Sequence, residues 1–139
     1  MPVQFTVDEM NAFLDEIFPQ IKGQFIVEQL DDTGTVMRLR INDTHLRPGG
    51  TVSGPSMFGL ADVAAYVATM GQIGKQALAV TTGCSIDFMR KPEAGKDLIA
   101  KATLLKMGKT LSVTDILLYS EGKPDPVARS TMTYSIPPR

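Results

Sequence analysis

The chain has 139 residues, of which 43% are hydrophobic and 21% are charged, a composition typical of a globular domain. This length predicts one domain over residues 1–139, with a core that needs no disulfide or metal to hold it together. Fourteen basic and fifteen acidic side chains give a net charge of −1, so no field of one sign is available to bind nucleic acid or an anionic membrane surface. A single Cys and a single His exclude a disulfide framework within the chain and a zinc site built from thiolates or histidines.

The start of the chain predicts a helix rather than a secretory signal. Its first ten residues, MPVQFTVDEM, lack the basic and then apolar pattern of such a signal, so we expect a cytoplasmic protein. Thr6 and Glu9 have the spacing of a capping box, and apolar residues recur at helical spacing up to Pro19. Residues 6–22 therefore predict a short amphipathic helix that covers the core.

Strand patterns lie on both sides of one long apolar segment. Residues 24–30 and 35–41 are rich in strand-forming residues and flank the turn residues 32–34. In the second of these strands apolar and basic side chains alternate, which predicts a sheet with one buried face. The other predicted strands cover residues 77–91, 97–108, 109–120 and 127–136.

Residues 55–74 form the longest predicted helix, which follows a polar, Gly-rich loop over residues 42–54. Apolar residues surround nearly every side of this helix, so other structure must wrap it. Asp62 interrupts the apolar run and argues against a membrane span. Long strands after one wrapped helix predict an α+β fold in which a curved antiparallel sheet encloses the helix.

Asp62 is the only residue between Arg47 and Lys75 that carries a charge at neutral pH. A carboxylate in an apolar helix must be partnered, be held protonated, or lie in a cleft. One interpretation is structural: Asp62 accepts a hydrogen bond from Tyr66, one turn later, or pairs with Arg47. The other is chemical, because carboxylates in unusual surroundings are candidates for catalysis.

A Gly-rich segment leads into the same helix and offers a second candidate group. The free N–H of Gly54 at the helix start favours an oxyanion or a polarised carbonyl. Gly54 and Asp62 are eight residues apart, which is roughly 12 Å along a helix, so one carbonyl cannot touch both in a single chain. Two helices packed antiparallel about a two-fold axis would instead place Gly54 of one chain opposite Asp62 of the other.

Three segments of the sequence resemble the hotdog-fold acyl-CoA thioesterases of the phenylacetate-pathway (PaaI-like) type. They are SGPSMFGLADVAAYVA, VTTGCSIDFMRKPEAG and MGKTLSVTDILLYS, and the resemblance covers roughly residues 24–136 in the same order. Relatives carry HGG at the start of the central helix and a carboxylate nine residues after the His, in an LAD triplet. The resemblance implies that Asp62 is the general base or the nucleophile. It also implies that the Gly54 N–H polarises the thioester from the partner subunit.

The chain departs from that family pattern at three positions. HGG is replaced by Ser53-Gly54-Pro55, so the motif His is absent. Relatives commonly carry Asn or Gln fifteen residues before the carboxylate, where this chain has Arg47. Arg47 could donate to the thioester carbonyl, hold an acidic acyl group, or neutralise Asp62. The single His, His45, is eight residues away from the motif position, and we expect it to be an ordinary loop residue.

Other residues are candidates for substrate contacts. Basic positions that meet the coenzyme A phosphates in relatives correspond to Arg90, Lys91 and Lys109. Small residues on the strand expected to flank the acyl tunnel are Thr82, Gly83 and Ser85. Ser53 and Tyr66, near Gly54 and Asp62, complete the candidate binding residues. Strand alternation points Cys84 to the face opposite Gly83 and Ser85, and we expect it to pack in the core.

The resemblance implies hydrolysis of an acyl-CoA thioester at a site shared between two subunits. The expected assembly is a homodimer, and commonly a dimer of dimers. No metal or redox cofactor is expected, and coenzyme A enters only as part of the substrate. One alternative is a hotdog module that binds acyl-CoA or a related ligand without catalysis, because the site is altered. Another is a hotdog dehydratase, an activity that normally needs a His with the acid. The acyl group is not predicted, because tunnel length depends on packing.

Overall fold

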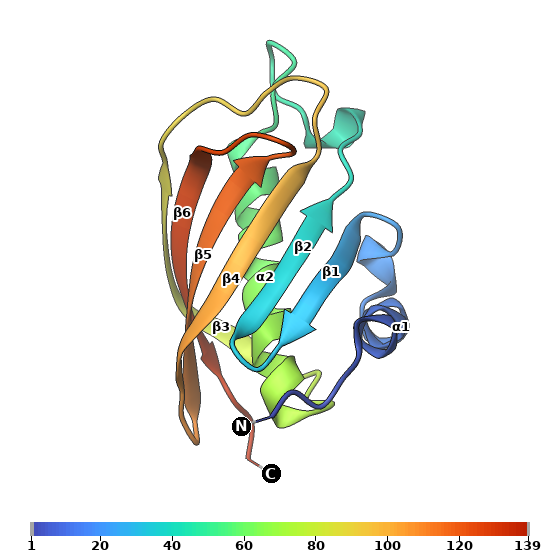
Figure 1. Ribbon diagram of the computed structural model, residues 1–139, viewed down its shortest axis with the longest axis vertical. Coiled ribbons are helices and arrows are strands. Elements are labelled where there is room, and N and C mark those ends of the chain that lie inside the picture. The colour runs from blue at the N-terminus through green and yellow to red at the C-terminus, as the bar shows by residue number, and fades with distance from the viewer. Residues whose placement is uncertain (1, 139) are drawn as a thin grey trace.

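A six-stranded antiparallel sheet curls around one long helix in the computed structural model, which describes residues 2–138 (Figure 1). The helices are α1 (Val7–Ile17) and α2 (Gly54–Ile73), with short 3-10 turns η1 (Pro19–Ile21) and η2 (Asp43–His45). The strands are β1 (Phe25–Asp31), β2 (Gly34–Leu39), β3 (Val80–Phe88), β4 (Leu98–Met107), β5 (Leu111–Ser120) and β6 (Pro126–Ser135). Their order in the sheet is β1-β2-β4-β5-β6-β3, so β1 and β3 are the edge strands.

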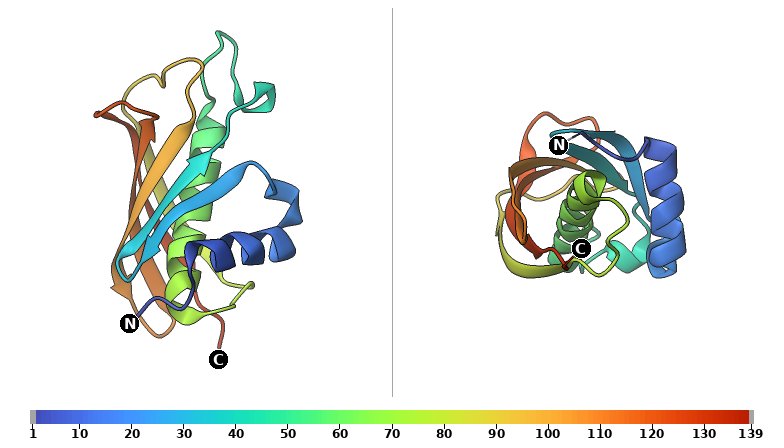
Figure 2. Two further views of the ribbon diagram at one scale, coloured as in Figure 1. Left: turned by 45° about the vertical axis from the view of Figure 1, so that its right-hand side comes forward. Right: turned by 90° about the horizontal axis from the view of Figure 1, so that it is seen from below.

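The central helix α2 is wrapped as its composition predicts. Every residue from Val63 to Ile73 is buried, and the view from below shows the helix inside the curl of the sheet (Figure 2). Ser53 caps the N-terminus, and Gly74 ends the helix with a φ of 86°, a conformation that favours glycine. The predicted helix over 55–74 is therefore confirmed, with its start one residue earlier.

The sheet presents one face to α2 and the other to solvent. In β2, Met37 and Leu39 are fully buried against the helix, as the alternation predicts. Arg38 points to the opposite face, where three carboxylates surround its guanidinium. Its partners are Glu28, Asp97 and Glu121, at 2.7–3.0 Å. These ion pairs connect β1 and β2 to the segments that flank β4 and β5.

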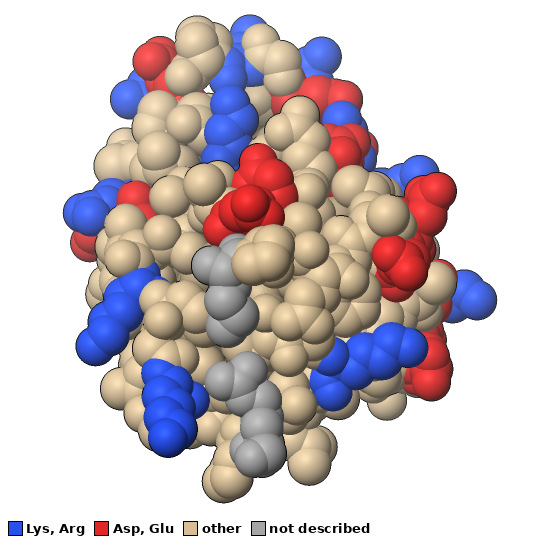
Figure 3. All heavy atoms as spheres, turned by 60° about the horizontal axis from the view of Figure 1, so that its bottom comes forward, with Lys and Arg blue, Asp and Glu red and all other residues tan. Residues whose placement is uncertain are grey.

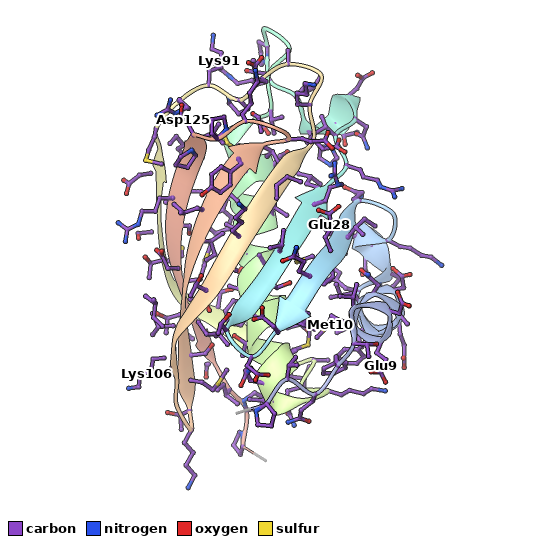
Figure 4. The ribbon with its side chains drawn as sticks, in the orientation of Figure 1. Glu9, Met10, Glu28, Lys91, Lys106 and Asp125 are labelled. Atoms are coloured by element: carbon purple, nitrogen blue, oxygen red, sulfur yellow. The ribbon has the colours of Figure 1, made fainter. Side chains whose placement is uncertain are left out.

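Helix α1 closes one side of the curl. The predicted capping box is present: the Glu9 N–H donates to Thr6 Oγ1 at 3.1 Å, and the Thr6 N–H donates to Glu9 Oε1 at 2.9 Å. On this helix Met10 is fully buried, whereas the neighbouring Glu9 is exposed (Figure 4). The Asn11 amide bonds both the N–H and the C=O of Val27, which fixes α1 against β1. The expectation that this helix covers the core is confirmed.

Edge strand β3 is largely exposed, which corrects one prediction from the sequence. Cys84 lies opposite the buried Met132, so its side chain points to the concave face, away from Gly83 and Ser85 as expected. Cys84 is nevertheless exposed. The prediction that it packs in the core is wrong for the single chain, because β3 is the last strand of the sheet. Large apolar side chains on and beside β3 are also exposed, namely Leu78, Val80, Phe88 and Met89.

The architecture is that of the hotdog fold: a long helix held inside a curved antiparallel sheet. The prediction of this fold from the sequence is confirmed. Within residues 2–138, no helix is long and apolar enough to cross a membrane. Acidic and basic side chains are interspersed on the face shown in Figure 3, in line with the near-zero net charge.

Candidate active site

Asp62 lies half-buried on α2 and is held by two hydroxyl groups from the sheet. Its Oδ1 accepts hydrogen bonds from Thr81 Oγ1 at 2.6 Å and from the Tyr134 hydroxyl at 2.7 Å. Neither partner expected from the sequence is used: the Tyr66 hydroxyl donates instead to the Ala77 carbonyl at 2.6 Å, and Arg47 lines a different cavity. Both donors bind Oδ1, so among residues 2–138 no protein group donates to Oδ2.

Asp62 opens onto a cavity of about 460 Å³ between α2, β3 and the C-terminal end of α1. Two tyrosine rings form one wall, with the centroids of Tyr66 and Tyr134 5.8 Å apart. Burial raises the pKa of Tyr66. Burial, followed by the nearby charge of Asp62, raises the pKa of Tyr134. Both phenols therefore stay protonated at neutral pH and act as hydrogen-bond donors.

Gly54 supplies the free backbone N–H at the start of α2. Ser53 uses both of its oxygens at this end: Oγ accepts from the Ser56 N–H at 3.3 Å, and the carbonyl accepts from the Met57 N–H at 3.1 Å. Pro55 has no N–H to offer. Within residues 2–138 the Gly54 N–H has no acceptor, so it is the donor that this helix end presents.

A second cavity, of about 370 Å³, contains Gly54 together with three of the predicted basic residues. These residues are Arg47, Arg90 and Lys91. The ring of Phe88 covers Gly54 closely: a Cβ at position 54 would lie 3.3 Å from Phe88 Cζ. The sequence did not predict a role for Phe88. The residue is 52% exposed because β3 lies at the edge of the sheet, and that position depends on the strand order. This cavity combines a free N–H, positive charge and an apolar wall.

The other predicted residues lie in different places. Gly83 and Ser85 line neither cavity: they pair with half-buried Thr133 and Thr131 on the convex face. Thr82 sits at a β-bulge, with its hydroxyl 3.4 Å from the Thr133 carbonyl. These are the three residues expected to flank an acyl tunnel, and a single chain does not bring them to Asp62.

Lys109 lies far from the other basic candidates in a single chain. It belongs to the turn between β4 and β5, near Lys106 towards the lower end of the sheet, whereas Lys91 lies at the upper end (Figure 4). Arg90 is anchored near that upper end, where its Nε donates to the Pro126 carbonyl at 2.9 Å.

His45 has a structural role. It is buried in η2, its Nδ1 accepts from the Asn42 N–H at 2.9 Å, and its Nε2 lies 2.9 Å from Gln24 Oε1. Burial lowers the pKa of the imidazole. Both nitrogens are thus engaged, and the expectation of an ordinary loop residue is corrected to a buried, hydrogen-bonded one. In the described part of the chain no group of three or more His, Cys, Asp or Glu side chains could hold a metal ion.

Asp62 and Gly54 therefore belong to two separate cavities. One half of the site offers a carboxylate with one oxygen held and the other available to take a proton. The other half offers an N–H that can bind a carbonyl oxygen, surrounded by positive charge. Along α2 the two groups are about 12 Å apart, too far to act on one carbonyl from the same chain.

Comparison with known proteins matches residues 49–127 to the thioesterase superfamily. A candidate thioesterase from Silicibacter sp. TM1040 is 59% identical, with a TM-score of 0.92 over 98% of this chain and 94% of that one. A mutant of the phenylacetic acid degradation protein PaaI from Thermus thermophilus is 27% identical, with a TM-score of 0.74 over 86% and 99%. The E. coli PaaI protein is 22% identical, with a TM-score of 0.77 over 96% and 97%.

A comparison with curated protein sequences finds no match. The family match covers more than half of the chain, and it includes both Gly54 and Asp62. The resemblance to PaaI-type hotdog proteins that the sequence motifs indicate is confirmed, and the chain belongs to the thioesterase superfamily.

Proposed function

We propose that the protein hydrolyses an acyl-CoA thioester at a site shared between two subunits. One observation carries the shared site: Gly54 and Asp62, the two groups that the reaction needs, line separate cavities of one chain. Membership of the thioesterase superfamily supports thioester hydrolysis. Coenzyme A as the thiol part is supported by Arg47, Arg90 and Lys91 around Gly54, because phosphates require fixed cations.

The free surface of α2 favours pairing with a second copy. Six residues of this helix are not buried, and four of them recur at helical spacing and form one stripe, namely Pro55, Phe58, Gly59 and Asp62; the other two, Gly54 and Ser56, lie in its first turn. Edge strand β3 adds an unpaired backbone edge and exposed apolar side chains beside this stripe. An antiparallel, isologous dimer would cover both and would set Gly54 of each subunit opposite Asp62 of the other. Such dimers would pair further into tetramers, as the resemblance implies.

In the proposed reaction, the Gly54 N–H binds the thioester carbonyl oxygen and stabilises the negative charge that develops there. Asp62 of the other subunit takes a proton from a water molecule, and the resulting hydroxide forms a C–O bond to the carbonyl carbon. The C–S bond then breaks, the carboxylic acid leaves, and the coenzyme A thiolate receives the proton. Direct attack by Asp62, through an anhydride that water cleaves, uses the same two groups. No bound cofactor takes part in either route.

The same dimer accounts for the position of Lys109. Antiparallel pairing carries the lower end of one sheet towards the upper end of the other, where Arg90 and Lys91 lie. Lys109 would then join the basic residues of the partner's Gly54 cavity and contact the nucleotide of coenzyme A.

Active-site complementation tests the shared site. Gly54→Pro removes the N–H, and proline is compatible with the first helical position after the extended Ser53. Gly54→Ala is the matched control, because it adds the same Cβ near Phe88 but keeps the N–H. We expect thiol release by Gly54→Pro to be about 10²-fold below that of Gly54→Ala.

Co-expression of Gly54→Pro with Asp62→Asn then gives the decisive result. Each mixed dimer would contain one intact site, so equal mixing should restore about one quarter of the wild-type rate. A mixture as inactive as its two parents would show that each site lies within one chain. A wild type that binds acyl-CoA esters but releases no thiol would favour the binding module, and water addition to an enoyl-CoA would favour the dehydratase.

A further inference from the structure

We propose that Tyr134 is a positioning residue for catalysis: its hydroxyl sets the orientation of the Asp62 carboxyl group. The proposal rests on the proposed function, because it assigns a role relative to the base or nucleophile. Tyr134 lies on β6, 72 residues away from Asp62, and the residue is 4% exposed.

One hydroxyl contacts two atoms of the same aspartate. The Tyr134 oxygen is 2.7 Å from Asp62 Oδ1 and 3.0 Å from the Asp62 backbone carbonyl oxygen. The carboxylate is thereby held against its own helix turn, and Thr81 Oγ1 binds the same oxygen from β3 at 2.6 Å. Oδ1 is fully engaged, so the oxygen left to accept a proton is Oδ2.

The environment makes Tyr134 a donor in this contact. Its raised pKa, which has burial as the main cause, keeps the phenol protonated. Tyr66 is the other titratable residue besides Asp62 that lines this cavity, and its hydroxyl is bound to the Ala77 carbonyl. Tyr134 is therefore the one phenol of this cavity that donates a hydrogen bond to the Asp62 carboxylate.

The test compares Tyr134→Phe with the wild type in a thiol-release assay on acyl-CoA esters. Loss of one charge-assisted hydrogen bond should lower kcat about tenfold and leave KM within about twofold. Tyr119→Phe is the matched control: this tyrosine lies on β5, where Lys101 covers its ring, away from both cavities.

A double variant separates positioning from stability. Adding Tyr134→Phe to Asp62→Asn should cause no further loss of kcat, because the group that Tyr134 positions is already disabled. An additive loss would mean that Tyr134 acts independently of Asp62, which would overturn the proposal while leaving the role of Asp62 intact. A Tyr134→Phe enzyme with wild-type kcat would overturn it as well. If Asp62→Asn itself is fully active, the proposed function fails first, and this role of Tyr134 fails with it.

Discussion

Replacing Asp62 with asparagine separates the chemical role of this residue from its structural role. Asparagine has the same shape, and its Oδ1 can still accept hydrogen bonds from Thr81 and Tyr134. What disappears is the negative charge, together with the basic Oδ2, which an NH₂ group replaces. The substitution therefore removes the proton acceptor while preserving the contacts that hold the side chain between α2, β3 and β6.

The structure sets the expected size of both effects. Each of the two hydrogen bonds loses its charge assistance, worth about 1 kcal/mol per bond, so the stability loss should not exceed about 2 kcal/mol. The neutral asparagine does not carry the cost of a half-buried charge, and this offsets part of that loss. Loss of a positioned general base instead costs about 10²–10⁴ in kcat, equivalent to about 3–5 kcal/mol of transition-state stabilisation. The rate should thus fall far more than the stability.

The assay measures thiol release from a panel of acyl-CoA esters and thermal unfolding on the same preparation. We expect Asp62→Asn to lower kcat at least 100-fold with KM nearly unchanged, and to lower Tm by less than about 10 °C. Asp15 is exposed on α1, so Asp15→Asn removes one negative charge from the surface. This variant controls for the change in net charge and should behave as wild type. A well-folded Asp62→Asn enzyme that turns over at the wild-type rate would refute the reasoning.

The remaining predictions concern the sheet and the basic cavity. Gly34→Ala should destabilise the protein by about 4 kcal/mol or more in thermal denaturation, because a Cβ there would lie 1.8 Å from the Ala102 carbonyl oxygen. Gly122 has a φ of 76° but open space around the position of a Cβ, so Gly122→Ala should cost only about 1–2 kcal/mol. Equal Tm values for these two variants would contradict the strand packing. Arg90→Ala should raise KM for acyl-CoA about tenfold with kcat unchanged. Lys96 lies in the same loop but outside the Gly54 cavity, so Lys96→Ala should leave KM unchanged. An equal rise in KM for a truncated pantetheine ester would contradict a phosphate contact by Arg90.

The parts of the fold that depend on local pattern were predictable from the sequence. The helix from Gly54 to Ile73 follows from its apolar composition, in which Asp62 is the one charge, and from the Gly residues near its ends. The capping box of Thr6 and Glu9 is encoded within four consecutive residues, and the structure contains it. Asp62 stood out because a single charge in a wrapped helix requires a special environment.

Contacts between distant elements were not predictable in the same way. Tyr134 and Thr81 meet Asp62 only because the sheet curls around α2, and no spacing in the sequence relates residue 62 to residue 134. The exposure of Cys84 depends on the strand order, which places β3 at an edge. Composition alone could not distinguish that edge strand from an interior one, since β3 is as rich in strand-forming residues as its neighbours.

A β-bulge in β3 places Thr81 on a face that the two-residue alternation of a strand would not give it. Strict alternation places Thr81 on the same face as Gly83 and Ser85, and those two residues do point to the convex face. The register shifts between Thr81 and Gly83, so Thr81 lies opposite Tyr134 on the concave face instead. That shift is what lets Thr81 and Tyr134 bind the same oxygen of Asp62. Bulges of this kind re-aim side chains beside functional sites, and the two-residue period of a strand gives no sign of them. The alternation rule therefore fails in β3 at the place where the strand meets the candidate catalytic carboxylate.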